Sequence, residues 1–236
     1  MDIASLVHNY QTPEEAVDIV KTTNILLLVG ISGAGKDTIK KRLIGGGDYM
    51  DIVSHTTRAP RHNNGVAEVD GEDYHFITMN EAERMLRDEE FIEAKYVHGT
   101  IYGTSVAAVK ASHDSHKIAV TDVDVQGVAE YKNLSQDVMA LFILPPDYET
   151  WRERLHKRYP SSEEFAAEWP KRRASAIDEL THALEVPYYH FIINDDLDRA
   201  VRVVHEIAHR GDEFNRHDDE ARLVARDLLD AIMSAE

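Results

Sequence analysis

The sequence contains no cysteine, which excludes disulfide bonds and thiolate metal sites. Positive charge is also scarce: 26 Lys and Arg stand against 43 Asp and Glu, giving a formal net charge of −17. Nucleic acids and anionic membranes are bound through basic patches, so this balance argues against both as partners. It leaves room for a phosphate compound, provided that a few arginines and lysines converge locally.

Two further features are missing. No apolar stretch approaches membrane-spanning length, and the N-terminus has no basic region followed by an apolar run. We therefore expect no transmembrane helix and no signal peptide, and a cytoplasmic location fits the absence of cysteine. The 236 residues, 43% of them hydrophobic, suffice for one packed domain, with or without appendages.

Apolar runs alternate with helical patterns along most of the chain, which favours a doubly wound α/β sheet. Buried strands are predicted at "NILLLVG", "KIAVTDVDV", "VMALFILPP" and "YHFIIND", each followed by a helical pattern. Segment 51–104 differs, because short polar–apolar alternations and several glycines predict a small, mostly β insertion. Its one helix is predicted at "MNEAERMLRD".

Both ends of the chain predict helices outside this alternation. "QTPEEAVDIV" has the pattern of a helix start, with Thr12 as the cap, Pro13 in the first turn and Glu15 closing a capping box. We expect this helix to be an appendage. Near the C-terminus, an apolar stripe typical of an amphipathic helix includes Val224, Leu228 and Ile232. That helix is expected to pack on its own chain, with a dimer contact as the alternative.

The stretch "ILLLVGISGAGKDTIKKRL", residues 25–43, predicts a phosphate-binding loop between a buried strand and a helix. Glycines let the backbone turn tightly and aim its N–H groups at phosphate oxygens, and the helix dipole adds to the attraction. Lys36 supplies a point charge for the terminal phosphates. The alternative is a glycine-rich turn without a ligand. The residues predicted to bind a nucleotide triphosphate here are Gly30, Ser32, Gly33, Ala34, Gly35, Lys36, Asp37 and Thr38.

Asp37 stands where such loops usually carry Ser or Thr. A carboxylate at a helix start is stabilised by the dipole by about 0.3–1 kcal/mol, which alone could explain it. Beside a triphosphate, however, it needs an intervening cation. We therefore expect Asp37 on the Mg²⁺ side of the loop, with the Thr38 hydroxyl nearby.

A second anion site is predicted at "SHTTRAPR", residues 54–61, where Arg58 and Arg61 flank a turn stiffened by Pro60. An exposed basic turn is the alternative. The following insertion supplies tyrosines, hydroxyls and a carboxylate. One carboxylate can accept both donors on the pairing edge of guanine, whereas adenine presents an acceptor there and is rejected.

The chain resembles the guanylate kinase family of P-loop nucleoside monophosphate kinases over roughly residues 24–205. The resemblance rests on "GISGAGKDT", "SHTTRAPR", "DGEDYHF", "FIEAKYVHGTIYGTS", "DVDVQG", "FILPP", "RERLHKR" and "NDDLDRAV", in that order. It implies transfer of the γ-phosphate of ATP to GMP, with Mg²⁺, by a P-loop core, a GMP-binding insertion and a mobile helical lid. ATP and GMP are the implied small-molecule substrates, with deoxy-GMP a further candidate, and the oligomeric state is left open between monomer and homodimer.

Position by position, the resemblance implies that the GMP phosphate is bound by Arg58, Arg61 and Tyr74, with Tyr102 beside them. Guanine is then read by Glu93, with Ser54 and Thr104 as hydroxyl partners. Asp124 matches an acidic residue of the nucleotide site, and Asp122 lies two residues before it. Both follow a buried strand, where open α/β sheets bind ligands. A local turn or cap role is the alternative for Asp122.

Phosphoryl transfer needs alignment and positive charge around the migrating group. Arg154 and Arg158 lie one helical turn apart, and "PKRRASA" contributes Arg172 and Arg173. The polar segment between them, bounded by prolines, predicts a hinged lid. By resemblance the catalytic residues are Lys36, Arg58, Arg154, Arg158 and Arg172, and Asn194 lies near the adenine. A charged helix face, and for Asn194 a turn role, are the alternatives.

The expected organisation has five parts. They are an N-terminal helical extension (1–23), a core segment with the P-loop (24–53), a GMP-binding subdomain (54–104), the rest of the core with a lid at about 158–172 (105–211), and a C-terminal helical extension (212–236). Asp37 departs from the common loop, and the link "HNNGVA" and the lid are longer than expected for the family.

Two other functions stay open at this point. A non-catalytic guanylate-kinase-like domain that binds phosphoproteins has no need for Lys36 or the lid arginines. A related kinase acting on ribose bisphosphate could share Asp after the loop lysine, but has no need for Glu93 and its hydroxyl partners.

Overall fold

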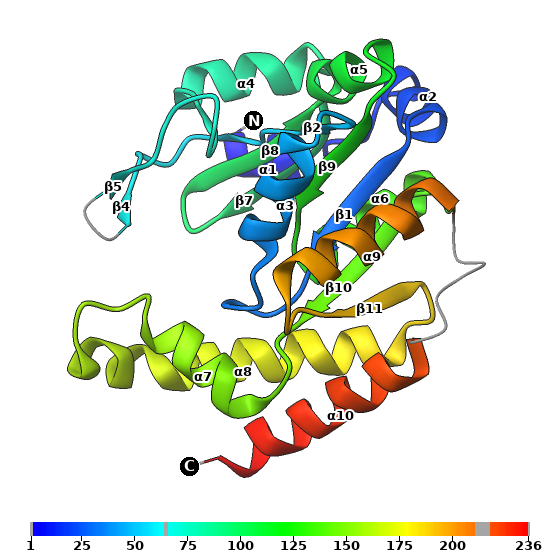
Figure 1. Cartoon of the computed structure of the whole chain (residues 1–236). Coiled ribbons are helices and arrows are strands. Elements are labelled where there is room, and N and C mark those ends of the chain that lie inside the picture. The colour runs from blue at the N-terminus through cyan, green and yellow to red at the C-terminus, as the bar shows by residue number, and fades with distance from the viewer. Residues whose placement is uncertain (1, 64–65, 211–217, 236) are drawn as a thin grey trace. The chain divides into compact units, whose positions relative to one another are not determined.

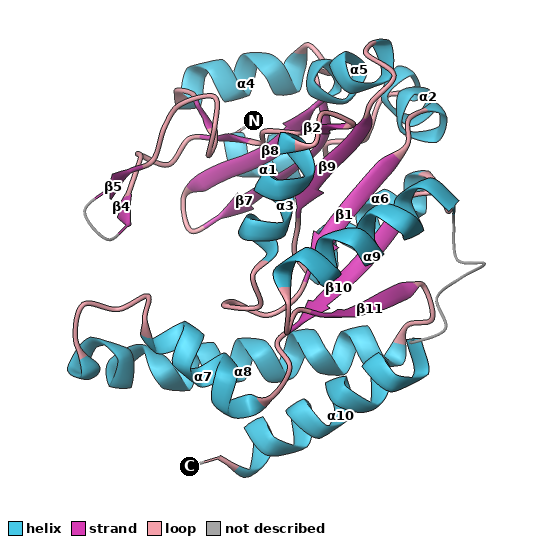
Figure 2. Cartoon of the chain, in the orientation of Figure 1, coloured by secondary structure: helices cyan, strands magenta, loops and turns pink. Residues whose placement is uncertain are grey.

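The chain, described here from a computed structural model covering residues 2–63, 66–210 and 218–235, forms two compact units. Unit 1 comprises residues 1–25, 49–121 and 130–138, and unit 2 comprises residues 26–48, 122–129 and 139–236. Figure 1 labels the helices and strands along the chain, and Figure 2 separates them by type. Within the described ranges, no helix combines the length and apolar character needed to cross a membrane.

The predicted α/β fold is confirmed: a parallel five-stranded sheet has the order β11-β10-β1-β9-β2. The order runs outward in both directions from β1, as in a doubly wound sheet. Its strands are β1 (Ile25–Val29), β2 (Tyr49–Asp51), β9 (Ile118–Asp122), β10 (Met139–Leu144) and β11 (Tyr189–Ile193). All five residues of β1 are buried, which explains its uninterrupted apolar sequence.

Unit 1 contains the predicted β insertion as a mixed sheet of order β6-β3-β8-β7, with a separate β4–β5 pair. Its strands are β3 (His55–Thr56), β4 (His62–Asn63), β5 (Val66–Ala67), β6 (His75–Phe76), β7 (Phe91–Val97) and β8 (Thr100–Ser105). Its helices are α1 (Ile3–His8), α2 (Glu14–Thr22), α4 (Met79–Arg87) and α5 (Val106–Asp114). Residues 64–65, inside the link predicted to be long, lie outside the described residues.

The N-terminal segment is part of the packing of unit 1. Val7 of α1 joins the buried cluster around Leu86 and Phe91, and the Tyr10 hydroxyl donates to the Phe91 carbonyl at 2.5 Å. The predicted cap is wrong: α2 has Pro13 at its cap position, and the Thr12 hydroxyl donates instead to the Ile92 carbonyl at 2.8 Å. A tertiary partner has replaced the local capping interaction.

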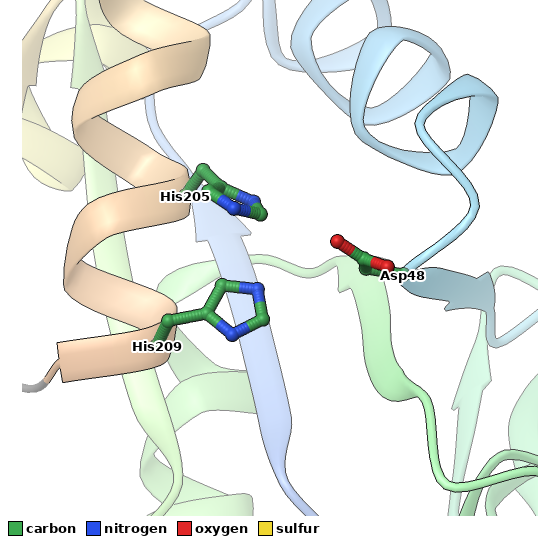
Figure 3. A group of neighbouring side chains, drawn as sticks. All are labelled: Asp48, His205 and His209. Carbon is green, nitrogen blue, oxygen red and sulfur yellow. The ribbon is translucent and has the colours of Figure 1, made fainter.

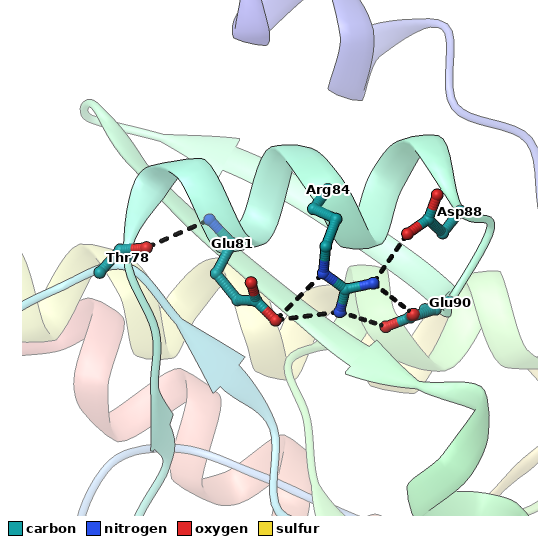
Figure 4. Close-up of polar contacts among 5 residues, drawn as sticks. All are labelled: Thr78, Glu81, Arg84, Asp88 and Glu90. Atoms are coloured by element: carbon teal, nitrogen blue, oxygen red, sulfur yellow. Dashed lines mark hydrogen bonds and ion pairs between the residues drawn. The ribbon is translucent and has the colours of Figure 1, made fainter.

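Helix α4 has the cap that its sequence favours. The Thr78 hydroxyl accepts the Glu81 N–H, and the Arg84 guanidinium bridges the carboxylates of Glu81, Asp88 and Glu90 (Figure 4). These pairs are exposed, so each contributes little to stability. They fix the turn that leads into β7, the strand that carries Glu93.

Unit 2 holds β1, β10 and β11 in parallel register, with Leu28 opposite Leu141 and Phe142 opposite Phe191. Its helices are α3 (Lys36–Gly45), α7 (Tyr148–His156), α8 (Ser162–Glu185), α9 (Leu197–Arg210) and α10 (Asp218–Ser234), and α6 (Val125–Leu134) begins in it. The C-terminal tail is the predicted amphipathic helix. Leu228 and Ile232 are buried, and α10 packs against α8 and β11 of its own chain. Residues 211–217 lie outside the described residues.

The segment predicted as a lid is largely helical. Pro160 precedes α8, and Pro170 lies well inside this 24-residue helix. Proline removes one backbone donor from the helix interior and is normally a breaker there. Phe165 and Leu180 are buried on either side of it, so packing maintains the helix through Pro170.

Candidate functional site

The predicted phosphate loop runs from the end of β1 into α3, within unit 2. Gly30, Gly33 and Gly35 all have positive φ angles, of 135°, 89° and 98°, which side chains rarely adopt. The Trp151 indole N–H of α7 donates to the Ser32 carbonyl at 2.8 Å and fixes the loop from one side. The glycines thus give the loop its shape, and α3 starts at Lys36 with its N-terminal N–H groups toward the loop.

Gly30→Ala is expected to lower the free energy of unfolding by about 2–4 kcal/mol. A Cβ at residue 30 would lie 2.3 Å from the Ile143 carbonyl oxygen, and φ is positive, so both sterics and backbone strain oppose it. Gly47→Ala is the matched control, because φ there is +94° with open space around the Cβ, and should cost about 1–2 kcal/mol. Chemical unfolding followed by circular dichroism measures both. Equal losses for the two variants would contradict the packing argument.

Lys36 is held inside the loop, where its ammonium donates to the Gly30 carbonyl. Burial lowers the pKa of Lys36, and the carboxylates of Glu179 and Asp122 oppose that shift. In turn, burial raises the pKa of Glu179, which Lys36 counteracts. Glu179 of α8 was not predicted, although it lies seven residues after Arg172 and so on the same helix face.

Asp37 lies at the exposed rim of the loop. Its carboxylate is 3.4 Å from the Arg158 guanidinium, which also donates to the Ser32 hydroxyl at 2.8 Å. Arg158 therefore contacts the loop at two points, although it comes from the chain after α7. This places a second positive charge beside the residues predicted to bind the terminal phosphates.

A pocket of about 370 Å³ opens beside the loop in unit 2. It is lined by Gly33, Gly35, Asp37, Thr38, Arg154, Arg158, Asn194, Asp195 and Leu197. Asn194 is buried, and its amide donates to the Ala34 carbonyl at 2.8 Å. Asn194 therefore also has the structural role left open as the alternative, and it lies at the pocket where the adenine was expected.

The three other arginines considered in the sequence, Arg154, Arg172 and Arg173, have different partners in unit 2. Arg154 donates to the Asn194 carbonyl at 3.0 Å and lines the pocket. Arg172 is oriented by the Tyr159 hydroxyl at 2.8 Å. Arg173 instead donates to the Ile232 and Met233 carbonyls at the end of α10. Arg173 thus binds the end of the C-terminal helix, whereas its neighbour Arg172 contacts Tyr159. The two adjacent arginines therefore have different structural partners.

Asp122 is the last residue of β9 and Asp124 follows two residues later, both in unit 2. The Lys40 ammonium lies 2.9 Å from the Asp122 carboxylate. Burial acts to raise the pKa of Asp122, but Lys40 and Lys36 outweigh it and the net pKa is lowered, so the carboxylate is charged. Asp124 accepts the Gly127 N–H at 2.7 Å and so bonds to the first turn of α6. Asp122 thus lies beside Lys36 and Lys40 in unit 2, and the predicted role of both acids in GMP binding stays a prediction.

The predicted GMP-phosphate residues gather in unit 1. The Arg58 guanidinium lies 5.2 Å from the Tyr74 ring centroid, and the Tyr74 and Tyr102 rings are 6.1 Å apart. Arg58 also forms a two-point ion pair with Glu68, at 2.7 and 3.1 Å, and Glu68 accepts the Arg61 N–H at 2.7 Å. The Arg61 side chain itself is exposed. Glu68 was not predicted, and its two hydrogen bonds orient the Arg58 guanidinium.

Glu93 of β7 is half-buried beside Thr104 of β8, whose hydroxyl donates to its carboxylate at 2.7 Å. The two residues are paired across the β7–β8 ladder. Burial raises the pKa of Glu93 to about 6, against the opposing effect of the Thr104 hydrogen bond. The carboxylate of Glu130 raises it further. A carboxylate that binds a proton this readily also accepts donors strongly from a ligand.

Two unpredicted residues of α6 complete the surroundings of Glu93 in unit 1. Tyr131 is fully buried, and burial together with the Glu93 charge raises the pKa of its hydroxyl. Glu130 lies 3.4 Å from Lys95 of β7. Ser54, predicted to contact guanine, is half-buried in front of β3, and its carbonyl accepts the His75 N–H at 2.9 Å. Nothing in the local sequence around Glu130 and Tyr131 indicates that they lie near Glu93 of β7. The sequence alone therefore did not predict that they surround Glu93.

A family model, curated relatives and a solved structure all show similarity to guanylate kinases. The family model described as guanylate kinase matches residues 22–210. A guanylate kinase of Maricaulis maris is 38% identical over 187 residues, covering 78% of this chain and 82% of the relative. One of Paraburkholderia xenovorans is 34% identical, covering 82% and 83%. A crystal structure of guanylate kinase from Anaplasma phagocytophilum aligns with a TM-score of 0.59 at 25% identity, covering 86% of this chain and 97% of the other.

Proposed function

The chain belongs to the guanylate kinase family, and on that basis we propose that it transfers the γ-phosphate of ATP to GMP, giving ADP and GDP. The observation that carries this proposal is the Glu93 carboxylate, half-buried and held by Thr104 in the unit that also contains Arg58, Tyr74 and Tyr102. A carboxylate in the same unit as a cluster of arginine and tyrosines suits a purine monophosphate whose base carries two adjacent donors.

The donor side of the proposal uses the loop of unit 2. The backbone N–H groups of residues 30–38 and the dipole of α3 bind the β- and γ-phosphates of ATP. The Lys36 ammonium exchanges its hydrogen bond to the Gly30 carbonyl for one to a phosphate oxygen. This exchange is favourable because a neutral acceptor is replaced by an anion. The adenine lies in the pocket beside Asn194, and Arg154 lines the same pocket.

The acceptor side uses unit 1. Arg58, already oriented by Glu68, binds the GMP phosphate together with Arg61 and the hydroxyls of Tyr74 and Tyr102. Glu93 accepts the ring N–H and the exocyclic amine of guanine, and Ser54 and Thr104 contact the base with their hydroxyls. This corresponds to a GMP-binding subdomain at 54–104. The lid is assigned to about 158–172, with the helical extensions 1–23 and 212–236 outside the catalytic core.

In the transfer step, an oxygen of the GMP phosphate attacks the γ-phosphorus as the bond to the β,γ-bridging oxygen of ATP breaks. ADP leaves, and no general base is needed because the attacking oxygen is already ionised. Lys36, Arg154, Arg158 and Arg172 supply the positive charge that the migrating group requires. For Arg172 and Arg158 this means leaving Tyr159 and Asp37 for phosphate oxygens.

The loop also offers oxygen donors suited to Mg²⁺. Asp37 and Thr38 are exposed at its rim, and Asp122 lies nearby with its charge retained. Carboxylate and hydroxyl oxygens of this kind fit the hard ligand preference of the ion. When bound with ATP, Mg²⁺ would neutralise charge on the β- and γ-phosphates. Asp37 is the residue that we assign to its ligand sphere, directly or through water.

An acceptor panel tests the proposed reaction. Release of ADP by the full chain is followed with ATP and Mg²⁺ in the presence of GMP, AMP, ribose bisphosphate or no acceptor. The proposal expects release with GMP far above that with AMP and close to none with the other two. Release with ribose bisphosphate alone would identify a sugar-phosphate kinase, and no release with any acceptor would identify a non-catalytic binding domain.

The raised pKa of Glu93 predicts a pH dependence in GMP recognition. Above about pH 6 Glu93 is ionised and accepts both guanine donors, whereas below it the protonated acid loses one acceptor site. The value of kcat/KM for GMP should therefore fall as the pH is lowered through 6, since this ratio reports groups of the free enzyme. Steady-state assays between pH 5 and 8 measure it.

The GMP phosphate also gains a proton as the pH falls through about 6. The control variant must therefore show this effect of the substrate while lacking the Glu93 carboxylate. Glu93→Gln does so, because the amide does not titrate. The ratio of wild-type to Glu93→Gln kcat/KM should shrink as the pH drops through 6. A ratio that stays constant over the whole range would contradict the role given to the Glu93 carboxylate.

A further inference from the structure

Three metal-ligating side chains converge in unit 2 apart from the phosphate loop. His205 and His209 lie on α9, and Asp48 lies in the turn between α3 and β2. Figure 3 shows both imidazole rings and the carboxylate directed into one space. One ligand atom from each residue lies within 4.8 Å of the other two, and the two rings have centroids 4.2 Å apart.

We propose that Asp48, His205 and His209 bind one divalent transition-metal ion, of which Zn²⁺ is the one best suited to the donor set. Two imidazole nitrogens and one carboxylate oxygen, with remaining positions for water, form an established kind of zinc site. Mg²⁺ and Ca²⁺ are disfavoured, because both prefer sites built from oxygen donors alone. The site goes beyond the proposed kinase reaction and does not depend on it.

The geometry suits this assignment for two reasons. Residues at i and i+4 of a helix project from the same face one turn apart, so α9 presents both rings side by side without any change of backbone. A tetrahedral ion with ligands at about 2.0–2.2 Å holds its donor atoms about 3.3 Å apart. Asp48 and His209 are exposed and His205 is half-buried, so side-chain rotation can close the remaining distance.

Charge also favours a cation here. Asp48 contributes a carboxylate, the two imidazoles bind as neutral ligands, and the chain carries a formal net charge of −17. A bound ion would join the turn after α3 to the last turns of α9, and helices α3 and α9 already pack together within unit 2. Because the ion requires both segments in place, it binds the folded chain in preference to the unfolded chain and raises the melting temperature.

The test uses the full chain without nucleotide, titrated with Zn²⁺ alone by calorimetry and followed by thermal unfolding. One equivalent of Zn²⁺ should bind and raise the melting temperature, whereas Mg²⁺ at the same concentration should not. Co²⁺ in place of Zn²⁺ should give visible absorption typical of a site with nitrogen ligands. His209→Ala and Asp48→Asn each should weaken Zn²⁺ binding at least about tenfold.

His8→Ala is the matched control, because His8 is an exposed helix-end histidine in unit 1, and it should bind Zn²⁺ as the wild type does. Melting temperatures measured without metal show whether each variant is folded. The proposal is overturned if the wild type binds no Zn²⁺. It is also overturned if folded His209→Ala and Asp48→Asn keep wild-type affinity, which would place the bound ion elsewhere.

Discussion

Lys36→Met is expected to lower kcat by about 10²–10³-fold, equivalent to about 2.7–4 kcal/mol of transition-state stabilisation. Methionine keeps the length of the side chain but removes the charge that we assign to the migrating phosphoryl group. The effect should fall mainly on kcat, because the loop N–H groups and the α3 dipole still bind ATP in the ground state. Steady-state kinetics with saturating GMP and varied ATP separates the two parameters.

The loss should not arise from unfolding. Burial already lowers the pKa of Lys36, so the folded state gains little from this charge and methionine should be tolerated in the loop. Lys41→Met is the matched control, because Lys41 is exposed on the same helix and should leave kcat unchanged. A folded Lys36→Met variant that retains more than a tenth of wild-type kcat would show that the phosphoryl group is stabilised by other charges.

Glu93→Ala is expected to reduce kcat/KM for GMP by about 10²–10⁴-fold while leaving the value for AMP unchanged or higher. Each hydrogen bond from guanine to the carboxylate is worth about 1.5–3 kcal/mol, and alanine removes two of them. For AMP, the same change removes a carboxylate that faces an acceptor on the adenine ring. The preference for GMP over AMP should therefore collapse.

Glu83→Ala removes a half-exposed carboxylate of α4 in the same unit and should leave both acceptors unaffected. Thermal unfolding of Glu93→Ala is needed alongside the kinetics, since Thr104 loses its acceptor in that variant. An unchanged ratio of GMP to AMP activity in a folded Glu93→Ala variant would contradict the account of base selection.

The features that sequence predicted best are those determined by local pattern. The run at residues 25–29 is apolar throughout because both faces of a parallel strand are buried, and it is β1. Three closely spaced glycines before Lys36 predict a loop with positive φ angles, and all three have them. The amphipathic tail also follows from its apolar stripe, and Leu228 and Ile232 of that stripe are buried against their own chain.

The features that sequence missed depend on contacts between distant segments. Thr12 has the residue type of a helix cap, but a carbonyl of β7 provides a better partner than the local N–H groups. Pro170 has the residue type of a helix end, yet tertiary packing keeps α8 continuous. Local propensity was outweighed in both cases, because packing energies exceed the fraction of a kilocalorie that propensity supplies per residue.

The same limit applies to the candidate site. Arg58, Glu93 and Lys36 could be named from motifs, whereas their partners Glu68, Glu130 and Glu179 could not, because a carboxylate without a motif has no distinguishing pattern. Glu130 adds to the raised pKa of Glu93, Glu179 opposes the lowered pKa of Lys36, and Glu68 orients Arg58. The His205–His209 spacing is visible in the sequence, but only the fold brings Asp48 to it.

The most direct test of the central claim follows the phosphoryl group itself. The full chain is incubated with Mg²⁺, GMP and ATP labelled in its γ-phosphate, and the products are separated. The account predicts that the label appears in the β-phosphate of GDP, in amounts equal to the ADP formed, and that inorganic phosphate stays at the level seen without GMP. Label released as inorganic phosphate with no labelled GDP, or no reaction of ATP at all, would contradict it.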